Sequence, residues 1–218
     1  MLHERLTRRR MVKIEINGKE YNVPSDWDDV TMKDYCDWFY KLPSTDGIED
    51  GILKATAALK NESIIISRIL GEDDSFAMGL PLQAYTMVRN HTSFIYSIDG
   101  FLETNVFHIT IDGRKYWIPR PEEMSLRQYI DSDIIMKDSE NKQQFIELLA
   151  CLLVPVDKGE YDGNYEELVP KIERMSARDG LPFVYTFLKK KIISKLLTRD
   201  CLRAAQVVEG FVKSTQGS

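Results

Sequence analysis

Hydrophobic and polar residues alternate in two short stretches of the chain that resemble each other. The first is KIEINGKEYNVP at residues 13–24, and the second is HITIDGRKYWIP at residues 108–119. Alternation of this kind is typical of a half-buried strand. The first stretch contains an Asn-Gly pair and the second an Asp-Gly pair, and both favour the two-residue type I′ turn, which needs positive φ at both positions. Each stretch therefore predicts a β-hairpin.

The register of each hairpin places its apolar residues on one face. In the first hairpin Ile14 lies opposite Tyr21, and in the second Ile109 lies opposite Tyr116. A proline follows each hairpin and ends it, because proline lacks the backbone donor that a strand needs. An isolated hairpin is marginally stable in water, so we expect helices to cover both apolar faces.

The two hairpins begin a longer repeat. A shift of 95 residues superimposes matching residue types, namely Ile14 on Ile109, Gly18 on Gly113, Tyr21 on Tyr116 and Pro24 on Pro119. After the loss of one residue, VTMKDY (30–35) falls on MSLRQY (124–129). A hairpin, a proline, an acidic loop and a helix start recur in the same order, which indicates an internal duplication.

The segments that follow each hairpin have helical spacing or composition. Thr31 and Ser125 are suited to cap the first helix of their units. Further helices are predicted at residues 49–71, 81–98, 140–155, 164–180, 182–197 and 199–214. We therefore predict an α+β fold, mainly helical overall, made of two repeated units of a β-hairpin followed by helices, with an extra C-terminal helix. The predicted parts are a basic N-terminal arm (1–11), a first hairpin-helical unit (12–100) and a second unit with the C-terminal helix (101–218).

The outer faces of the two hairpins differ. The first carries charged and polar residues, whereas the second places His108 opposite Trp117. A large aromatic side chain on a nominally exposed face needs cover. Two interpretations account for it: the two units of the chain pack together there, or another subunit does. Trp117 and His108 are therefore candidate interface residues.

Charge is unevenly distributed along the chain. The net charge is −5 over 218 residues, which makes nucleic acid an improbable partner of the whole chain. Basic residues crowd the start, including Arg8, Arg9 and Arg10, and a second basic cluster lies near the end. These arginines are either a solvated face or a docking site for an acidic partner or nucleic acid. No apolar run has membrane-spanning length, so a membrane is not an expected partner.

Signals for catalysis are weak. The histidines His3, His91 and His108 stand far apart and outside any metal-ligand motif. The chain has neither a nucleophile elbow nor a glycine-rich phosphate loop. Three widely spaced cysteines form no CxxC pair. The sequence therefore assigns no catalytic residue, metal or cofactor, and an acidic hydrolase or nuclease would need three carboxylates gathered around a metal.

The phrase IEINGKEYNVPSDWDDVTMKDYCDW (14–38) carries a family resemblance. It resembles the opening of small proteins encoded among the structural genes of tailed bacteriophages, including tail-assembly chaperone-like proteins and virion components of crAss-like phages. The matching positions are Asn17, Gly18, Lys19, Tyr21, Pro24, Trp27, Val30, Thr31 and Tyr35. The second copy keeps Asp112, Gly113, Arg114, Tyr116, Pro119, Ser125 and Tyr129 but lacks the tryptophan.

This resemblance implies a non-enzymatic role in a phage particle. The expected function is a structural component of the portal, neck or tail region of a virion that is assembled in the host cytoplasm. Its expected partners are other phage structural proteins and further copies of itself in a ring. The alternative is a tail-assembly chaperone that the finished particle does not retain. The resemblance carries over no catalytic residue.

Overall fold

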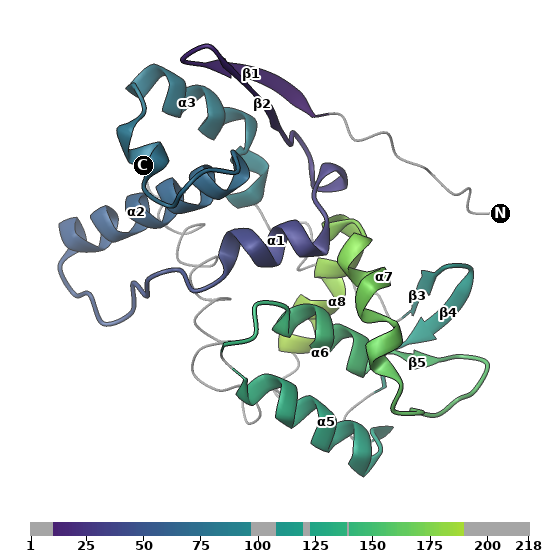
Figure 1. Cartoon of the computed structure of the whole chain (residues 1–218). Helices are drawn as coiled ribbons and strands as arrows, with labels where there is room; N and C mark the ends of the chain where they lie inside the picture. The colour runs from purple at the N-terminus through teal and green to yellow at the C-terminus, as the bar shows by residue number, and fades with distance from the viewer. Residues whose placement is uncertain (1–10, 97–107, 120–122, 139, 190–218) are drawn as a thin grey trace.

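The protein has an α+β fold in which helices predominate, as the sequence predicts (Figure 1). The computed structural model describes residues 11–96, 108–119, 123–138 and 140–189, without the side chains of 184–189. The predicted arm, the unit boundary near residue 100 and the helix at 199–214 lie outside the described residues.

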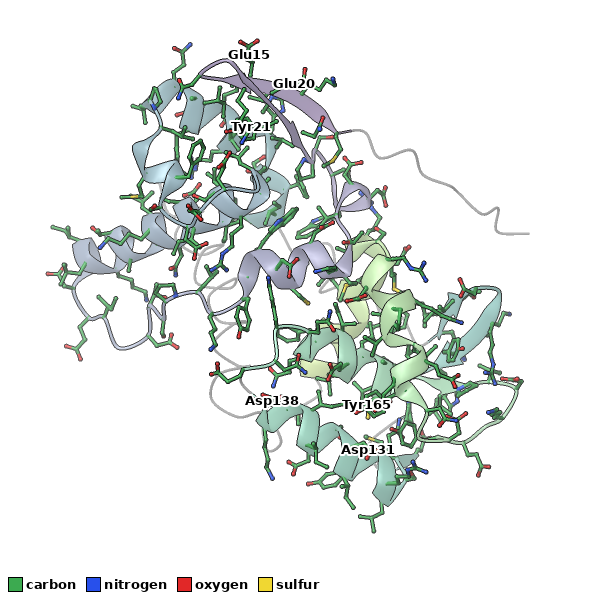
Figure 2. The ribbon with its side chains drawn as sticks, in the orientation of Figure 1. Glu15, Glu20, Tyr21, Asp131, Asp138 and Tyr165 are labelled. Carbon is green, nitrogen blue, oxygen red and sulfur yellow. The ribbon has the colours of Figure 1, made fainter. Side chains whose placement is uncertain are left out.

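The first hairpin has the predicted turn and register. It consists of β1 (Val12–Ile16) and β2 (Lys19–Val23), with Ile14 opposite Tyr21. Asn17 and Gly18 have φ angles of 52° and 79°, as a type I′ turn requires. Glu15 and Glu20 lie on the outer face of the hairpin, and Tyr21 is buried on the side of the helices (Figure 2).

The second hairpin matches the prediction and gains a third strand. It consists of β3 (His108–Ile111) and β4 (Arg114–Trp117), joined by Asp112 and Gly113 at φ 49° and 77°. The third strand, β5 (Val154–Pro155), pairs antiparallel with β4. The sequence predicts helix as far as residue 155 instead, because a two-residue strand is too short to show alternation.

Six helical segments follow the first hairpin. They are η1 (Trp27–Asp29), α1 (Met32–Phe39), α2 (Gly51–Ile69), η2 (Phe76–Gly79), α3 (Leu82–His91) and η3 (Ser93–Tyr96). Thr31 caps α1 as predicted, in a capping box with Asp34. The side chain of Asp50 caps α2 by accepting bonds from two backbone N–H groups of its first turn. The predicted helix at 81–98 is interrupted at Thr92, which ends α3 and precedes η3.

The described helices of the second unit depart from the prediction again after η5. They are α5 (Leu126–Lys137), α6 (Gln144–Leu152), η5 (Tyr165–Glu167), α7 (Val169–Arg174) and α8 (Ala177–Lys189). Ser125 caps α5 as predicted. The predicted helix at 164–180 is wrong as one element, because Met175 is extended and separates α7 from α8. Consequently α8 starts before Pro182, which lies inside it rather than at its start.

A backbone contact between the two units explains this break. Thr31 and Ser176 form an antiparallel bridge. The N–H of Met32 donates to the carbonyl of Met175 at 2.9 Å, and the N–H of Ala177 donates to that of Val30 at 2.8 Å. These extended residues cannot also be helical. The bridge therefore fixes the starts of α1 and α8 against each other.

The two units share one hydrophobic core. Helix α1 lies at the centre of the molecule, between α2 on one side and α6, α7 and α8 on the other (Figure 1). Its buried residues belong to a cluster that also contains Ile66 of α2, Ile146 of α6, Ile172 of α7 and Leu181 of α8. A second, smaller cluster lies between α5 and α6.

Contacts that recur in both units agree with the duplication. In the first unit Lys19 pairs with Glu72, which lies in the turn after α2. In the second unit Arg114, at the equivalent position of its hairpin, pairs at 2.9 Å with Asp157, which lies in the turn after β5. Each cation also lies over the ring of the tyrosine two residues later, at 4.9 Å and 5.6 Å from the centroid. Both hairpins are therefore anchored by the same kind of contact, to the turn after α2 in the first unit and to the turn after β5 in the second.

Candidate interaction surface

Helix α5 presents an apolar face to solvent. We define the α5 face by the residues Leu126, Tyr129, Ile130 and Ile134, whose exposed fractions are 75%, 45%, 46% and 62%. Their spacing of three, four and eight residues from Leu126 places them along one side of the helix. A contiguous exposed apolar surface of this kind marks a site of protein contact more often than chance exposure does.

The opposite side of α5 is buried although it carries polar residues. Gln128 is 1% exposed, and its amide donates to the carbonyls of Cys151 at 2.9 Å and Leu152 at 3.3 Å, which end α6. The hydroxyl of Tyr161 donates to Asp131 at 2.7 Å, on the side of α5 that faces α6 and Tyr165 (Figure 2). Hydrogen bonds thus satisfy the inward polar groups, and the helix is oriented with its apolar face outward.

Equivalent positions in the first unit are buried. Met32, Tyr35 and Cys36 of α1 correspond to Leu126, Tyr129 and Ile130 of α5. The three residues of α1 are 0%, 7% and 3% exposed because α6, α7 and α8 pack around that helix. The α5 face is therefore the counterpart of a buried interface.

A second group of exposed apolar residues lies on the first unit. These residues belong to the start of α2, to η2 and to the start of α3, namely Ile52, Leu53, Leu59, Met78 and Leu82. The first two turns of α2 are exposed on all sides and extend beyond the rest of the fold (Figure 1). The Oγ of Ser63 lies 3.1 Å from the Sδ of Met78, so η2 packs along the middle of α2.

Of the residues that the sequence nominates, the structure describes Trp117 and His108, which belong to β4 and β3 and not to the α5 face. Trp117 is half-buried in β4, with His108 opposite it on β3 and Val154 opposite it on β5. His108 is exposed. Arg8, Arg9 and Arg10 lie outside the described residues. An interface at Trp117 stays a prediction, and β5 supplies an apolar neighbour within the same unit.

The α5 face is not among the surfaces predicted from the sequence, although its apolar residues are visible there. Comparison of the two units shows apolar residues at 126, 129 and 130 matched to apolar residues of α1. The sequence alone does not say that α1 is covered and α5 is not. That difference depends on α7 and α8, which lie against α1.

A pocket of about 520 Å³ lies between the first hairpin and α1. Its charged lining is already paired. Arg68 donates to Asp74 through two bonds of 2.7 Å and caps the end of α1 by donating to the carbonyl of Tyr40 at 2.6 Å. Asp37 pairs with Lys33 at 3.0 Å and Lys142 at 2.8 Å. Burial opposes the ionisation of Asp37, but these lysines outweigh it and lower its pKa. These contacts join the end of α1 to α2 and to the segment before α6.

No group of three metal-ligating side chains is found among the residues that the structure describes. The two described cysteines, Cys36 and Cys151, are buried thiols. Burial raises the pKa of each to about 12, which suppresses the reactive thiolate. None of the described helices is long and apolar enough to cross a membrane.

Comparison of the chain with protein-family models, curated proteins and solved structures gives no match. Functional inference therefore rests on the surfaces of the molecule and on the resemblance of its hairpin phrase.

Proposed function

We propose that the protein is a non-enzymatic structural component of a tailed-phage virion, in the portal, neck or tail region, that acts through protein–protein contacts. The observation that carries the contact role is the exposed α5 face, with Leu126 at 75% and Ile134 at 62% exposure. Single exposed apolar residues are ordinary, whereas four along one helix side need a partner to cover them.

The phage context rests on the resemblance of residues 14–38. These residues build the first hairpin, η1 and most of α1. In the proposed role they are a scaffold, since Tyr21, Trp27 and Tyr35 are all buried. The scaffold positions surfaces that bind other phage structural proteins, and neither a membrane nor a nucleic acid is a proposed partner.

Quantitative mass spectrometry of purified particles of the phage that encodes the chain tests this function. We expect the protein at a fixed copy number per particle, comparable to that of other neck or tail proteins. Its absence from finished particles, with abundance in infected cells, would instead favour the tail-assembly chaperone. Particles that lack the gene product yet assemble and infect normally would contradict both roles.

A further inference from the structure

The start of α8 covers α1 through a close approach at a glycine. Gly180 lies so near Met32 that a Cβ at this position would be 2.5 Å from the methionine Sδ and 2.8 Å from its Cγ. Ala177 and Leu181 flank Gly180 on the same helix side and are fully buried. Met32, the first residue of α1, therefore packs directly on the backbone of α8 at Gly180, between two buried apolar side chains.

The same seven-residue pattern occurs in the first unit. SFAMGLP at residues 75–81 matches SARDGLP at residues 176–182, with serine, glycine, leucine and proline identical at a spacing of 101 residues. The first copy forms η2 with one residue before it and two after it, and the second forms the start of α8 with the residue before it. Gly79 is thus the counterpart of Gly180, as Leu126 is the counterpart of Met32.

Both counterparts lack a cover among the described residues. Gly79 is exposed, and a Cβ added there meets no atom within 4 Å. Met78 and Leu82 on either side of it are 64% and 80% exposed. Phe76 and Leu80 of the same segment pack against the core of the first unit. We call the exposed residues Met78, Gly79 and Leu82 the η2 face. The second unit therefore has an uncovered copy of α1, and the first unit has a copy of the covering segment whose glycine stays open.

The two faces do not meet within one chain. Helix α5 lies at one end of the molecule and α3, which follows η2 directly, lies at the opposite end (Figure 1). We propose that the α5 face of one copy packs on the η2 face of a second copy, with Leu126 seated over Gly79 as Met32 is over Gly180. This inference deepens the proposed function, on which it rests, by naming the partner as the chain itself.

Charge agrees with this pairing. Arg127 lies beside Leu126 in the first turn of α5, and its side chain is 66% exposed although its Nε lies 3.9 Å from a carboxylate oxygen of Asp131. Asp73 is exposed in the turn that leads into η2. Opposite charges at the rim of two apolar faces favour their association over contact between like faces.

The proposed contact joins two different surfaces and is therefore heterologous. A pair of copies keeps one free face of each kind, so association continues head to tail until a ring closes or a filament grows. Helix α7 lies in a stretch between α6 and the second heptapeptide that has no equivalent in the first unit, where only four residues separate Leu70 from Ser75. The contact between copies thus reproduces only the α8 part of the interface that covers α1 within the chain. Because it is smaller than that interface, we expect it to be reversible.

Sedimentation velocity of the purified full-length chain over a concentration series tests the proposal. We expect the wild-type mass to rise with concentration. Two variants should each weaken association about tenfold or more while keeping the wild-type circular dichroism. The first is Gly79→Leu, whose new side chain has space in the monomer. The second is the double variant Leu126→Asp, Ile130→Asp. Val156→Asp is the matched control, because Val156 is 47% exposed and lies on neither face.

A mixing experiment then separates this contact from a symmetric one. The Gly79→Leu variant retains its α5 face and the double aspartate variant retains its η2 face. Equal amounts of the two should form dimers that neither forms alone. A wild type that is monomeric at all concentrations, association that survives Gly79→Leu, or a mixture that stays monomeric would overturn the proposal. A change in thermal midpoint of the aspartate variant without a change in mass would overturn it too, because the α5 face would then stabilise the single chain rather than its association.

The result is distinguishable from that of the particle analysis. A protein that is present in purified particles but monomeric in solution, and whose incorporation is unaffected by Gly79→Leu, leaves the proposed function standing and removes this contact. A protein that forms the predicted head-to-tail assembly but is absent from particles removes the virion role and leaves the contact.

Discussion

Replacement of Gly180 by alanine tests the internal interface on which the fold depends. Gly180 lies in the first turn of α8, where an alanine ordinarily stabilises a helix by about 1 kcal/mol relative to glycine. Here the added Cβ would lie 2.5 Å from the Sδ of Met32 and 3.3 Å from its Cε. Met32 is 0% exposed, so its side chain has no open space into which it can move.

The expected magnitude follows from these two opposing effects. Overpacking of a filled core costs about 1–3 kcal/mol, and the gain in helix propensity offsets about 1 kcal/mol of it. We therefore expect Gly180→Ala to lower the free energy of unfolding by up to about 2 kcal/mol. Met32→Ala alone removes the clash but leaves a cavity, at a cost of about 2–5 kcal/mol.

A double-mutant cycle makes the reasoning decisive. In the Met32→Ala background the new Cβ has space, so Gly180→Ala should stabilise rather than destabilise. The assay is urea unfolding followed by circular dichroism, comparing midpoints at unchanged m-values. Gly79→Ala is the control, because nothing lies within 4 Å of a Cβ there and its effect should be a few tenths of a kcal/mol.

The effect of Gly180→Ala on the free energy of unfolding in the two backgrounds shows whether position 180 contacts Met32. If Gly180→Ala destabilises the Met32→Ala variant as much as the wild type, the two side chains are not in contact and α8 does not start against α1. If it stabilises the wild type, helix propensity outweighs packing and the close approach is not a constraint.

Three further predictions concern contacts within the two units. Arg68→Ala should lower the free energy of unfolding by about 2–3 kcal/mol in urea titrations, because it removes charge-assisted bonds to Asp74 and to the end of α1, and Arg68→Lys should recover only part of this. At pH 8 iodoacetamide should modify Cys36 and Cys151 about 1,000-fold more slowly than ordinary thiols, since burial raises the pKa of both from 9.0 to about 12, and labelling at denatured-state rates in mass spectrometry would contradict their burial. The lysines beside Asp37 and the guanidinium of Arg68 beside Asp74 lower the pKa of both carboxyls in the folded protein from the ordinary value of 3.8. Their contribution to stability is therefore complete above pH 3.8 and is lost as the pH falls through the folded pKa. The drop in urea midpoint from pH 6 to pH 3 should be smaller in the Asp37→Asn, Asp74→Asn variant.

Much of the fold follows from local rules that the sequence displays. The turns need only Asn-Gly or Asp-Gly and alternating neighbours, and the register of both hairpins is confirmed residue by residue. The caps at Thr31 and Ser125 are confirmed because a side-chain hydroxyl three residues before a free backbone N–H satisfies it without help from the rest of the chain.

The errors lie where distant segments decide the local structure. Met175 is extended because the segment that starts at Val30 pairs with it, 145 residues away in sequence. Likewise β5 is a strand only because the edge of β4 is available to it. Neither partner is visible in the local pattern, which reads as uninterrupted helix in both places.

The α5 face was not predictable for a related reason. An apolar stripe on a helix usually means burial, and the stripe from Leu126 to Ile134 indicates a core-facing helix when it is read alone. Only the structure shows that Gln128 is the buried residue of that turn, bonded to the carbonyl ends of α6. A buried, hydrogen-bonded glutamine beside an exposed leucine reverses the ordinary assignment of the two sides.

The difference between the hairpins now has a structural explanation. In the second unit the strand after α6 lies beside Trp117, so the aromatic side chain has Val154 as a cross-strand neighbour. In the first unit the turn after α2 contacts the hairpin through side chains instead, with Glu72 bonded to Lys19 and Tyr21, and Asn22 remains exposed and polar. The exchange of asparagine for tryptophan therefore accompanies the strand and does not by itself require a second subunit. Exposed apolar residues on α5 and around η2 remain, and a contact between chains at these two surfaces would bury apolar area that no described segment covers.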